Sequence, residues 1–327
     1  MPSIKLINHG TYGCVYHPGV KCNGSVESEK FITKIQKNDD TVQNEIRIGK
    51  AIKTIGNYTR FFAPIVGSCP AKITKKIMEG CDVMNTGSQT DYISTKIRFV
   101  GKQTLGDYIL GAEGGYNVKR ERYVRSQKHL LRAIAKMKDS GVAHFDVKHN
   151  NIMFDSRLKV PVFIDFGLSI LIDDVIGERN RGNLPRAFYT YNTYNYWPIE
   201  ITMFGYAFSK LGVDEASMRK ITVAELEKVI DVFINGRENS RGIKSPNDLF
   251  ESRLLGLSAD KFKRDALDYF GKYVGKTWMH MYDALMSAGV WKRWDKYGLD
   301  ATYLFLAEDA GEELYDLAPK IQLLPQQ

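Results

Sequence analysis

The sequence predicts an α+β fold, with a strand-rich part at residues 1–100 and a mostly helical part at residues 101–327. Three observations lead to this prediction. Short apolar segments separated by Gly, Pro and Asn fill the first part. Longer segments with apolar residues at helical spacing fill the second part. The 327 residues, 43% of them hydrophobic and 26% charged, are enough to build one large domain or two smaller ones.

Five strands and one helix are expected in the first part. The strands are short and rich in β-branched and aromatic residues, and they cover residues 4–7, 14–16, 31–35, 64–66 and 92–100. The helix covers residues 42–55, where Ile48, Ile52 and Ile55 repeat at helical spacing, and the N-cap candidates are Asp39, Asp40 and Thr41. The expected order is therefore three strands, a helix and two more strands.

The second part is expected to be helical, apart from two short apolar strands at residues 152–154 and 160–164. The expected helices cover residues 118–138, 223–235, 259–286 and 300–317. Residues 167–197 are rich in Asn, Arg and Tyr and predict a long loop. A loop of this length inside a compact domain is usually functional or mobile.

Composition narrows the class of protein. No apolar run is long enough to cross a bilayer, and the first residues lack the pattern of a signal peptide, so we expect a soluble intracellular protein, cytoplasmic by default. The four cysteines, Cys14, Cys22, Cys69 and Cys81, are too scattered for a disulfide scaffold and form no C-x-x-C zinc motif. Reduced thiols are therefore expected.

The net charge of +8 suits a phosphorylated ligand, nucleic acid or an acidic partner, but it is also common on solvated surfaces. The densest basic run contains Lys119, Arg120, Arg122, Arg125, Lys128 and Arg132. Apolar residues interrupt this run, so we interpret it as the outer face of one helix. Aromatic residues gather at 188–197, where peptide docking or packing is favoured over base stacking. We therefore expect no nucleic-acid partner.

The first motif is a glycine pair between strand-like segments. Gly10 and Gly13 can let backbone N–H groups close over a polyphosphate, although such pairs are also common in hairpin turns. Lys34 lies on the third strand, from which a lysine can reach phosphates under that turn. Glu45, on the following helix, can fix the direction of the lysine.

The second motif is His-Phe-Asp-Val-Lys-His-Asn-Asn at residues 144–151, followed by an apolar strand and Ile-Asp-Phe-Gly at residues 164–167. The side chains of Asp146, Asn151 and Asp165 carry oxygen and lie beside short strands. Such groups can hold magnesium and a hydroxyl nucleophile together. The ordered set, with strands on both sides, is typical of phosphoryl transfer.

These segments, taken in order, resemble the protein kinase superfamily from residue 7 to about residue 305. The resemblance implies a bilobal fold, with a β-rich N-lobe at residues 1–100 and a mostly helical C-lobe at residues 101–327. It implies that Gly10, Gly13 and Val15 belong to the phosphate-covering loop. Lys34 resembles the lysine that holds the α- and β-phosphates, and Glu45 the glutamate that pairs with it.

The same resemblance assigns the chemistry of the second part. Asp146 resembles the aspartate that accepts the proton of the substrate hydroxyl, and Asn151 and Asp165 resemble the ligands of two Mg²⁺ ions. Lys148 stands where serine/threonine kinases carry a lysine near the γ-phosphate. Within the hinge-like residues 97–105, the resemblance implies that Arg98 and Val100 meet the adenine through backbone groups.

Two departures from the family pattern stand out. Phe145 replaces the arginine that can pair with a phosphate on the activation segment, so we expect that segment to order itself without phosphorylation. Residues 197–200, Trp-Pro-Ile-Glu, resemble the end of the segment, but the best candidate for the next aspartate-bearing helix is residues 294–299. We therefore expect a helical insertion at about 201–290, a combination similar to divergent kinases encoded by large DNA viruses.

The resemblance implies an ATP-dependent serine/threonine protein kinase that uses Mg²⁺ and phosphorylates protein hydroxyls. It implies no membrane partner and makes the insertion a candidate partner site; a viral member would act in the host cytoplasm or the virion. Two alternatives remain open. One is a pseudokinase scaffold, and the other is a small-molecule phosphotransferase of the aminoglycoside or choline kinase kind, which generally lacks counterparts of Lys148 and Phe166.

Overall fold

The computed structural model describes residues 4–10, 13–71, 81, 91–111, 113, 115–237 and 245–326, and it has the α+β fold that the sequence predicts. The chain divides into two compact units. Unit 1 comprises Met1–Tyr108, Ala135–Val142 and Asn150–Ser169, and unit 2 comprises Ile109–Ile134, Ala143–His149 and Ile170–Gln327. The two units are described separately.

Unit 1 is built on a five-stranded antiparallel sheet with the strand order β1-β2-β3-β5-β4. Its strands are β1 (Lys5–Gly10), β2 (Gly13–His17), β3 (Phe31–Lys37), β4 (Ile65–Pro70) and β5 (Tyr92–Arg98). They correspond to the five strands expected from the sequence. The register places Lys34 of β3 opposite Val15 of β2 and Thr95 of β5, at the centre of the sheet.

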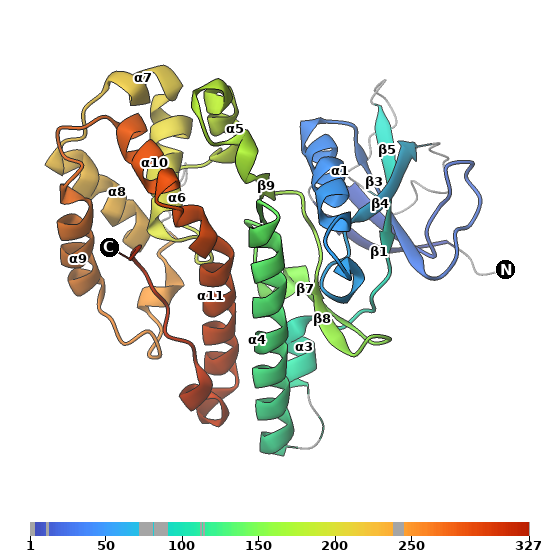
Figure 1. Cartoon of the computed structure of the whole chain (residues 1–327). Helices are drawn as coiled ribbons and strands as arrows, with labels where there is room; N and C mark the ends of the chain where they lie inside the picture. Colours follow the sequence, from blue (N-terminus) through green and yellow to red (C-terminus); the bar gives the residue numbers. More distant parts are fainter. Residues whose placement is uncertain are drawn as a thin grey trace. The chain divides into compact units, whose positions relative to one another are not determined.

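One long helix packs on this sheet. Helix α1 (Asp40–Lys53) is capped by Asp39, one of the three candidates, whose carboxylate accepts hydrogen bonds from the backbone N–H groups of Thr41 and Val42. The helix packs against β4 (Figure 1). Gly49 permits this close approach, because a Cβ at that position would lie 2.7 Å from the Ile65 carbonyl oxygen.

Two further strands complete unit 1. The strands β7 (Ile152–Asp155) and β8 (Val160–Phe163) form an antiparallel hairpin in which Ile152 lies opposite Phe163. The short helix α3 (Leu105–Leu110) begins in this unit and runs into unit 2, and the two-residue strand β6 (Val142–Ala143) lies at another boundary between the units along the chain.

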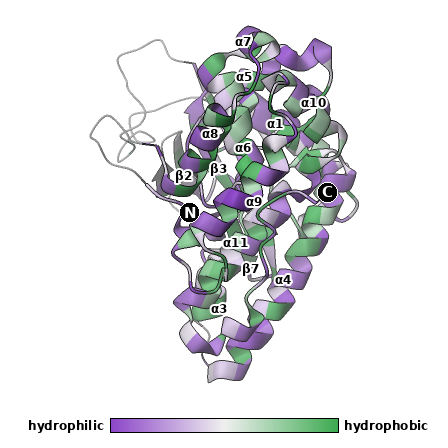
Figure 2. Ribbon diagram, turned by 90° about the vertical axis from the view of Figure 1, so that its left-hand side faces the viewer, coloured by the Kyte–Doolittle hydropathy of each residue, from purple (hydrophilic) through white to green (hydrophobic). Residues whose placement is uncertain are grey.

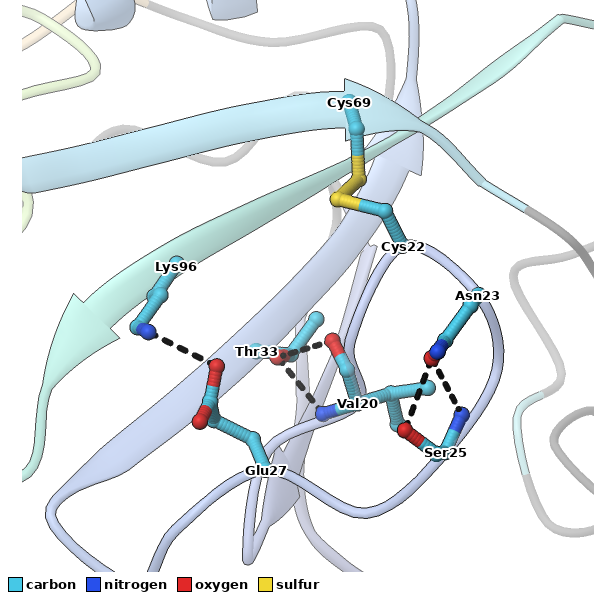
Figure 3. The surroundings of a disulfide bond; sticks show 8 residues. All are labelled: Val20, Cys22, Asn23, Ser25, Glu27, Thr33, Cys69 and Lys96. Atoms are coloured by element: carbon cyan, nitrogen blue, oxygen red, sulfur yellow. Dashed lines mark hydrogen bonds and ion pairs between the residues drawn. A yellow bond between two sulfur atoms is a disulfide. The ribbon is translucent and has the colours of Figure 1, made fainter.

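The expectation of reduced thiols is wrong in this structure, because all four cysteines form disulfides. Cys14 pairs with Cys81, and Cys22 pairs with Cys69, with Cα–Cα distances of 6.1 and 5.9 Å. Both distances lie in the ordinary range for a disulfide. Figure 3 shows the second bond joining β4 to the loop between β2 and β3. The pairs are separated by 67 and 47 residues, so only the folded sheet brings them together.

Unit 2 is mostly helical. Its helices are α4 (Gly115–Asp139, whose last turn belongs to unit 1), α5 (Leu184–Ala187), α6 (Ile199–Gly205), α7 (Val213–Met218), α8 (Val223–Asn235), α9 (Ala259–Gly271), α10 (Trp278–Ser287) and α11 (Trp294–Asp309), with a π-helix at Tyr206–Leu211. Aromatic side chains dominate the core. The largest fully buried ones are Trp278, Tyr282, Phe188, Phe204, Phe208, Phe233 and Phe262.

Three expectations about unit 2 need correction. The single helix expected at 259–286 is two helices, because Gly275 adopts a positive φ of 81° and the Thr277 side chain caps a new helix by accepting from the His280 N–H. The helix expected at 300–317 begins at Trp294 and ends at Asp309.

The third correction concerns the loop expected at 167–197, which contains several short elements. These are β9 (Ile170–Leu171), two 3₁₀ turns (Ile172–Asp174 and Glu178–Asn183) and α5.

Helix α4 carries the basic run, and Figure 2 shows hydrophilic and hydrophobic residues mixed along it. Two of the basic residues are paired within unit 2: Lys119 lies 2.7 Å from Glu313, and Arg120 lies 2.5 Å from Asp316. Arg125, Lys128 and Arg132 are exposed, as expected for an outer helix face, whereas Lys119 and Arg120 pair with the C-terminal segment. Within the described part of the chain, no helix is both long and apolar enough to span a membrane.

Candidate functional site

In unit 1 the structure brings Lys34 and Glu45 together. The Lys34 ammonium lies 3.5 Å from a Glu45 carboxylate oxygen, and Gln36 Nε2 donates to the same oxygen at 3.4 Å. Lys34 comes from the centre of the sheet, and Glu45 lies in the second turn of α1. The N-cap at Asp39 fixes where α1 begins, so it also sets the height of Glu45 along the sheet.

The Glu45 side chain is unusually buried for a residue that can carry a charge. The residue is only 4% exposed, and burial raises the pKa of its carboxyl, while Lys34 opposes the rise. The pKa of Glu45 is raised overall, because the effect of burial exceeds that of the ion pair with Lys34. A buried ion pair of this kind gives little or no net stability compared with apolar packing, which makes a functional role the better explanation.

The glycine pair closes the hairpin of β1 and β2. Gly10 lies opposite Gly13 in the register, and the intervening residues 11 and 12 are outside the described part of the chain. Gly13 also has a structural reason to be glycine, because a Cβ there would meet the Ile35 carbonyl oxygen and lie 2.7 Å from Gln36 Cβ on β3. Val15, two residues on, lies opposite Lys34.

Asn151 and Asp165 lie side by side at one end of the β7–β8 hairpin. The Ile164 N–H donates to the Asn151 carbonyl at 3.0 Å, continuing the ladder that pairs Ile152 with Phe163. Asn151 is buried, whereas Asp165 is exposed. Carboxylate and amide oxygens are the ligands that Mg²⁺ prefers, so this pair fits that ion. Among the residues described, no cluster of three or more His, Cys, Asp and Glu side chains could hold a metal.

The backbone of Asp165 is held in the left-handed region, with φ of 58°. Its Oδ1 accepts from the Gly167 N–H at 3.3 Å, and the neighbouring Phe166 is buried against Phe62 with ring centroids 6.3 Å apart. Phe166 thus anchors the turn in the core and leaves the Asp165 carboxylate on the surface. Non-glycine residues with positive φ cluster at functional sites.

Arg98 and Val100, the two residues that the resemblance implies at the adenine, lie at the end of β5 and two residues after it. The Arg98 guanidinium forms an ion pair with Asp155 and donates to the Thr59 carbonyl at 2.8 Å. Val100 is buried in a small cluster with Ala63 and Val162. The Arg98 side chain is therefore a structural tie within unit 1, and a ligand would meet this segment through other groups.

In unit 2, Asp146 lies on a loop at residues 144–149, which we call the Asp146 loop. The Lys148 ammonium lies 2.9 Å from Asp146 Oδ2. Asp295, in the first turn of α11, contacts the backbone of this loop. Its carboxylate accepts hydrogen bonds from the backbone N–H groups of His144 at 2.8 Å and Phe145 at 2.9 Å. Asp295 is buried, and burial raises the pKa of its carboxyl. The structure thus places residue 295 of the expected aspartate-bearing segment under this loop.

Phe145 has a strained backbone and an aromatic environment. Its φ is 67°, which is rare for a bulky residue. The ring lies 4.9 Å from that of Trp197, 5.5 Å from that of Trp294 and 6.1 Å from that of Phe188. At residue 145, where the resemblance implies a charged arginine, this chain therefore has a buried apolar side chain that packs against residues 188–197, which we call the aromatic segment.

A buried ion pair lies three residues after the aromatic segment. Glu200, in the first turn of α6, is fully buried and lies 3.4 Å from Arg293 Nε. Burial raises the pKa of the Glu200 carboxyl, and Arg293 opposes this rise. The pair connects the first turn of α6 to Arg293, the residue that precedes α11.

Sequence reasoning missed one contact at Asp146. The Tyr194 hydroxyl donates to Asp146 Oδ1 at 2.7 Å. The sequence signal was the aromatic run at 188–197, but several of its members are simply buried in the core, among them Phe188, Tyr191 and Trp197. Nothing in the run distinguished Tyr194 from its neighbours. Comparison of the sequence with known families and with curated proteins finds no match.

Proposed function

We propose that this chain is a protein kinase that transfers the γ-phosphoryl group of ATP to serine or threonine hydroxyls of proteins. The observation that carries the proposal is the pair formed by Lys34 and Glu45. A lysine at the centre of a sheet, held by a nearly buried glutamate from the adjacent helix, is the arrangement that protein kinases need for orienting the phosphate tail of ATP. Stability alone gives no comparable reason to bury this charge.

The remaining residues have defined roles in this proposal. Lys34 would hold the α- and β-phosphates, under the hairpin closed by Gly10 and Gly13. Asn151 and Asp165 would hold Mg²⁺, which when bound supplies positive charge beside the phosphate oxygens. The two oxygen ligands lie at one end of a rigid hairpin, so little ordering would be needed when the ion binds.

Asp146 and Lys148 would act on the acceptor. The acceptor hydroxyl gives its proton to Asp146 as its oxygen bonds to the γ-phosphorus, and the bond from that phosphorus to the β–γ bridging oxygen breaks, releasing ADP. Lys148 offsets the charge that develops on the transferring oxygens. The bonds from Asp295 keep the Asp146 loop in place during this step.

Radiolabelled phosphate transfer tests the proposal. The protein is incubated with γ-labelled ATP, Mg²⁺, and acidic and basic protein acceptors, beside Asp165→Ala and a control variant, Asp173→Ala, at an exposed aspartate of a 3₁₀ turn. Label on serine or threonine is expected for wild type and the control, and none for Asp165→Ala. A further variant, Asp146→Ala, is expected to incorporate at least ~100-fold less label than wild type. ATP binding without transfer would favour a scaffold, and transfer only to small molecules would favour the other phosphotransferase class.

A further inference from the structure

The contact between Tyr194 and Asp146 engages one side of the proposed base. Tyr194 lies between α5 and α6, and its hydroxyl donates to Asp146 Oδ1 at 2.7 Å. Lys148 lies 2.9 Å from the other oxygen, Oδ2. A carboxylate oriented through both oxygens has little freedom to rotate about its last torsion. Each oxygen has two lone pairs, so an acceptor hydroxyl can still donate to Asp146.

The Tyr194 ring is itself held in place. It packs edge-on against Trp197 at 5.0 Å and against Tyr196 at 5.3 Å. The Trp197 indole N–H donates to the Phe145 carbonyl oxygen at 2.6 Å, one residue before Asp146. The ring that carries the hydroxyl is therefore tied to the same loop as the carboxylate, and the two cannot move independently.

The chemistry of the hydroxyl fits a fixed donor. Burial and the neighbouring Asp146 charge raise the pKa of Tyr194 above its usual value, so the phenol keeps its proton at neutral pH. The hydrogen bond to a carboxylate is charge-assisted, and such bonds are stronger and more directional than neutral ones. Lys148 lies 5.8 Å from the centre of the same ring, which adds a cation–π contact.

We propose that Tyr194 is a positioning residue that orients the Asp146 carboxylate for proton acceptance and makes this orientation depend on the order of the aromatic segment. The inference rests on the proposed kinase function. Phe145 stands where the resemblance implies an arginine that can pair with a phosphate on the segment, so here apolar packing takes the place of that ion pair. Packing of Phe145 against Phe188 and Trp197 orders the segment, and Tyr194 transmits that order to the base.

The test is a double-mutant cycle on phosphate transfer, using Tyr194→Phe, Asp146→Ala and the double variant. Tyr194→Phe keeps the ring and removes the hydroxyl. We expect kcat to fall about 10-fold, equivalent to about 1.4 kcal/mol, with KM for ATP and peptide unchanged. In the Asp146→Ala background the same change is expected to leave the residual rate unaltered, because the hydroxyl acts through the carboxylate.

Tyr191→Phe is the matched control. Tyr191 belongs to the same segment, is buried, and within the described part of the chain its hydroxyl has no hydrogen-bond partner. We expect this variant to keep wild-type kcat. Equal rates for Tyr194→Phe and Tyr191→Phe would overturn the inference while the kinase function stands. An equal loss from Tyr194→Phe with and without Asp146 would also overturn it, since that is the result of a purely structural role. No transfer by wild type would overturn both proposals.

Discussion

Replacing Asp295 with asparagine tests how the Asp146 loop is supported. The carboxylate of Asp295 accepts two backbone N–H groups, from His144 and Phe145, in a buried position at the start of α11. Asparagine has almost the same shape but offers one acceptor oxygen and one NH₂ group. One of the two backbone N–H groups would then face another donor.

The expected loss follows from these two bonds. A hydrogen bond to a charged group contributes about 1.5–3 kcal/mol, and leaving a buried donor without a partner costs about 1–3 kcal/mol. Burial raises the pKa of Asp295, so removal of its charge recovers part of that loss. We therefore expect Asp295→Asn to lower the free energy of unfolding of unit 2 by about 2–4 kcal/mol.

Tryptophan fluorescence can measure this change in unit 2 alone. All four tryptophans of the chain, at positions 197, 278, 291 and 294, lie in unit 2. With a denaturant slope of about 2–3 kcal/mol per molar urea, the midpoint should fall by about 1 M. Asp300→Asn is the control on the same helix. Asp300 is also buried, but its partner Lys296 is half-exposed and can be hydrated when the ion pair is lost, so we expect a smaller decrease in stability than for Asp295→Asn.

The reasoning fails if Asp295→Asn unfolds at the same urea concentration as wild type, or if it loses no more stability than Asp300→Asn. In either case the bonds to His144 and Phe145 would not be what holds the loop on α11.

Three further predictions concern other parts of the chain. Gly298→Ala places a methyl group 3.0 Å from the Val147 carbonyl oxygen in the Asp146 loop. We therefore expect faster hydrogen exchange in residues 144–149 and several-fold slower phosphate transfer; unchanged exchange would contradict this. Burial raises the pKa of Tyr191 and Tyr196 to about 12, so between about pH 10 and 12 the folded state keeps protons that the unfolded state has lost. The stabilisation that these two groups give below about pH 10 should therefore be lost across this range. Ultraviolet absorbance should show their phenols ionising late and cooperatively, whereas simple titration near pH 10 would contradict the prediction. Gly13→Ala forces a methyl group against the Ile35 carbonyl, so β2 and β3 should exchange their amide hydrogens faster even without nucleotide, whereas a glycine needed solely for phosphate binding would leave exchange unchanged.

Local sequence signals predicted much of the fold. Helix α8 has the bounds expected from its apolar spacing, 223–235, and Thr222 forms a capping box with Glu225 at its start. The break between α9 and α10 was missed because the apolar pattern continues through it, while Gly275 and Thr277 give only local signals. The start of α11 was placed too late because nearly the whole helix is buried, and a helix buried all round has weak periodicity.

The candidate site was predictable where its residues belong to ordered motifs. Lys34 and Glu45 meet as expected, since a strand followed directly by a helix leaves few ways to arrange them. Contacts made at long range were not predictable. Tyr194 reaches Asp146 across 48 residues, and the disulfides join cysteines with no shared motif. Such contacts depend on how elements pack, and local sequence patterns do not show that packing.

The two units differ in their disulfide content. All four cysteines belong to unit 1, and unit 2 has none. The bond between Cys22 and Cys69 lies within the loop closed by Cys14 and Cys81, and in the chain-entropy model closing a loop of that size restricts the unfolded chain by about 4 kcal/mol. A thiol reductant would therefore remove this restriction from the unfolded chain of unit 1 and leave that of unit 2 unchanged. The stability of unit 1 depends in this way on the redox state of the surroundings, and that of unit 2 does not.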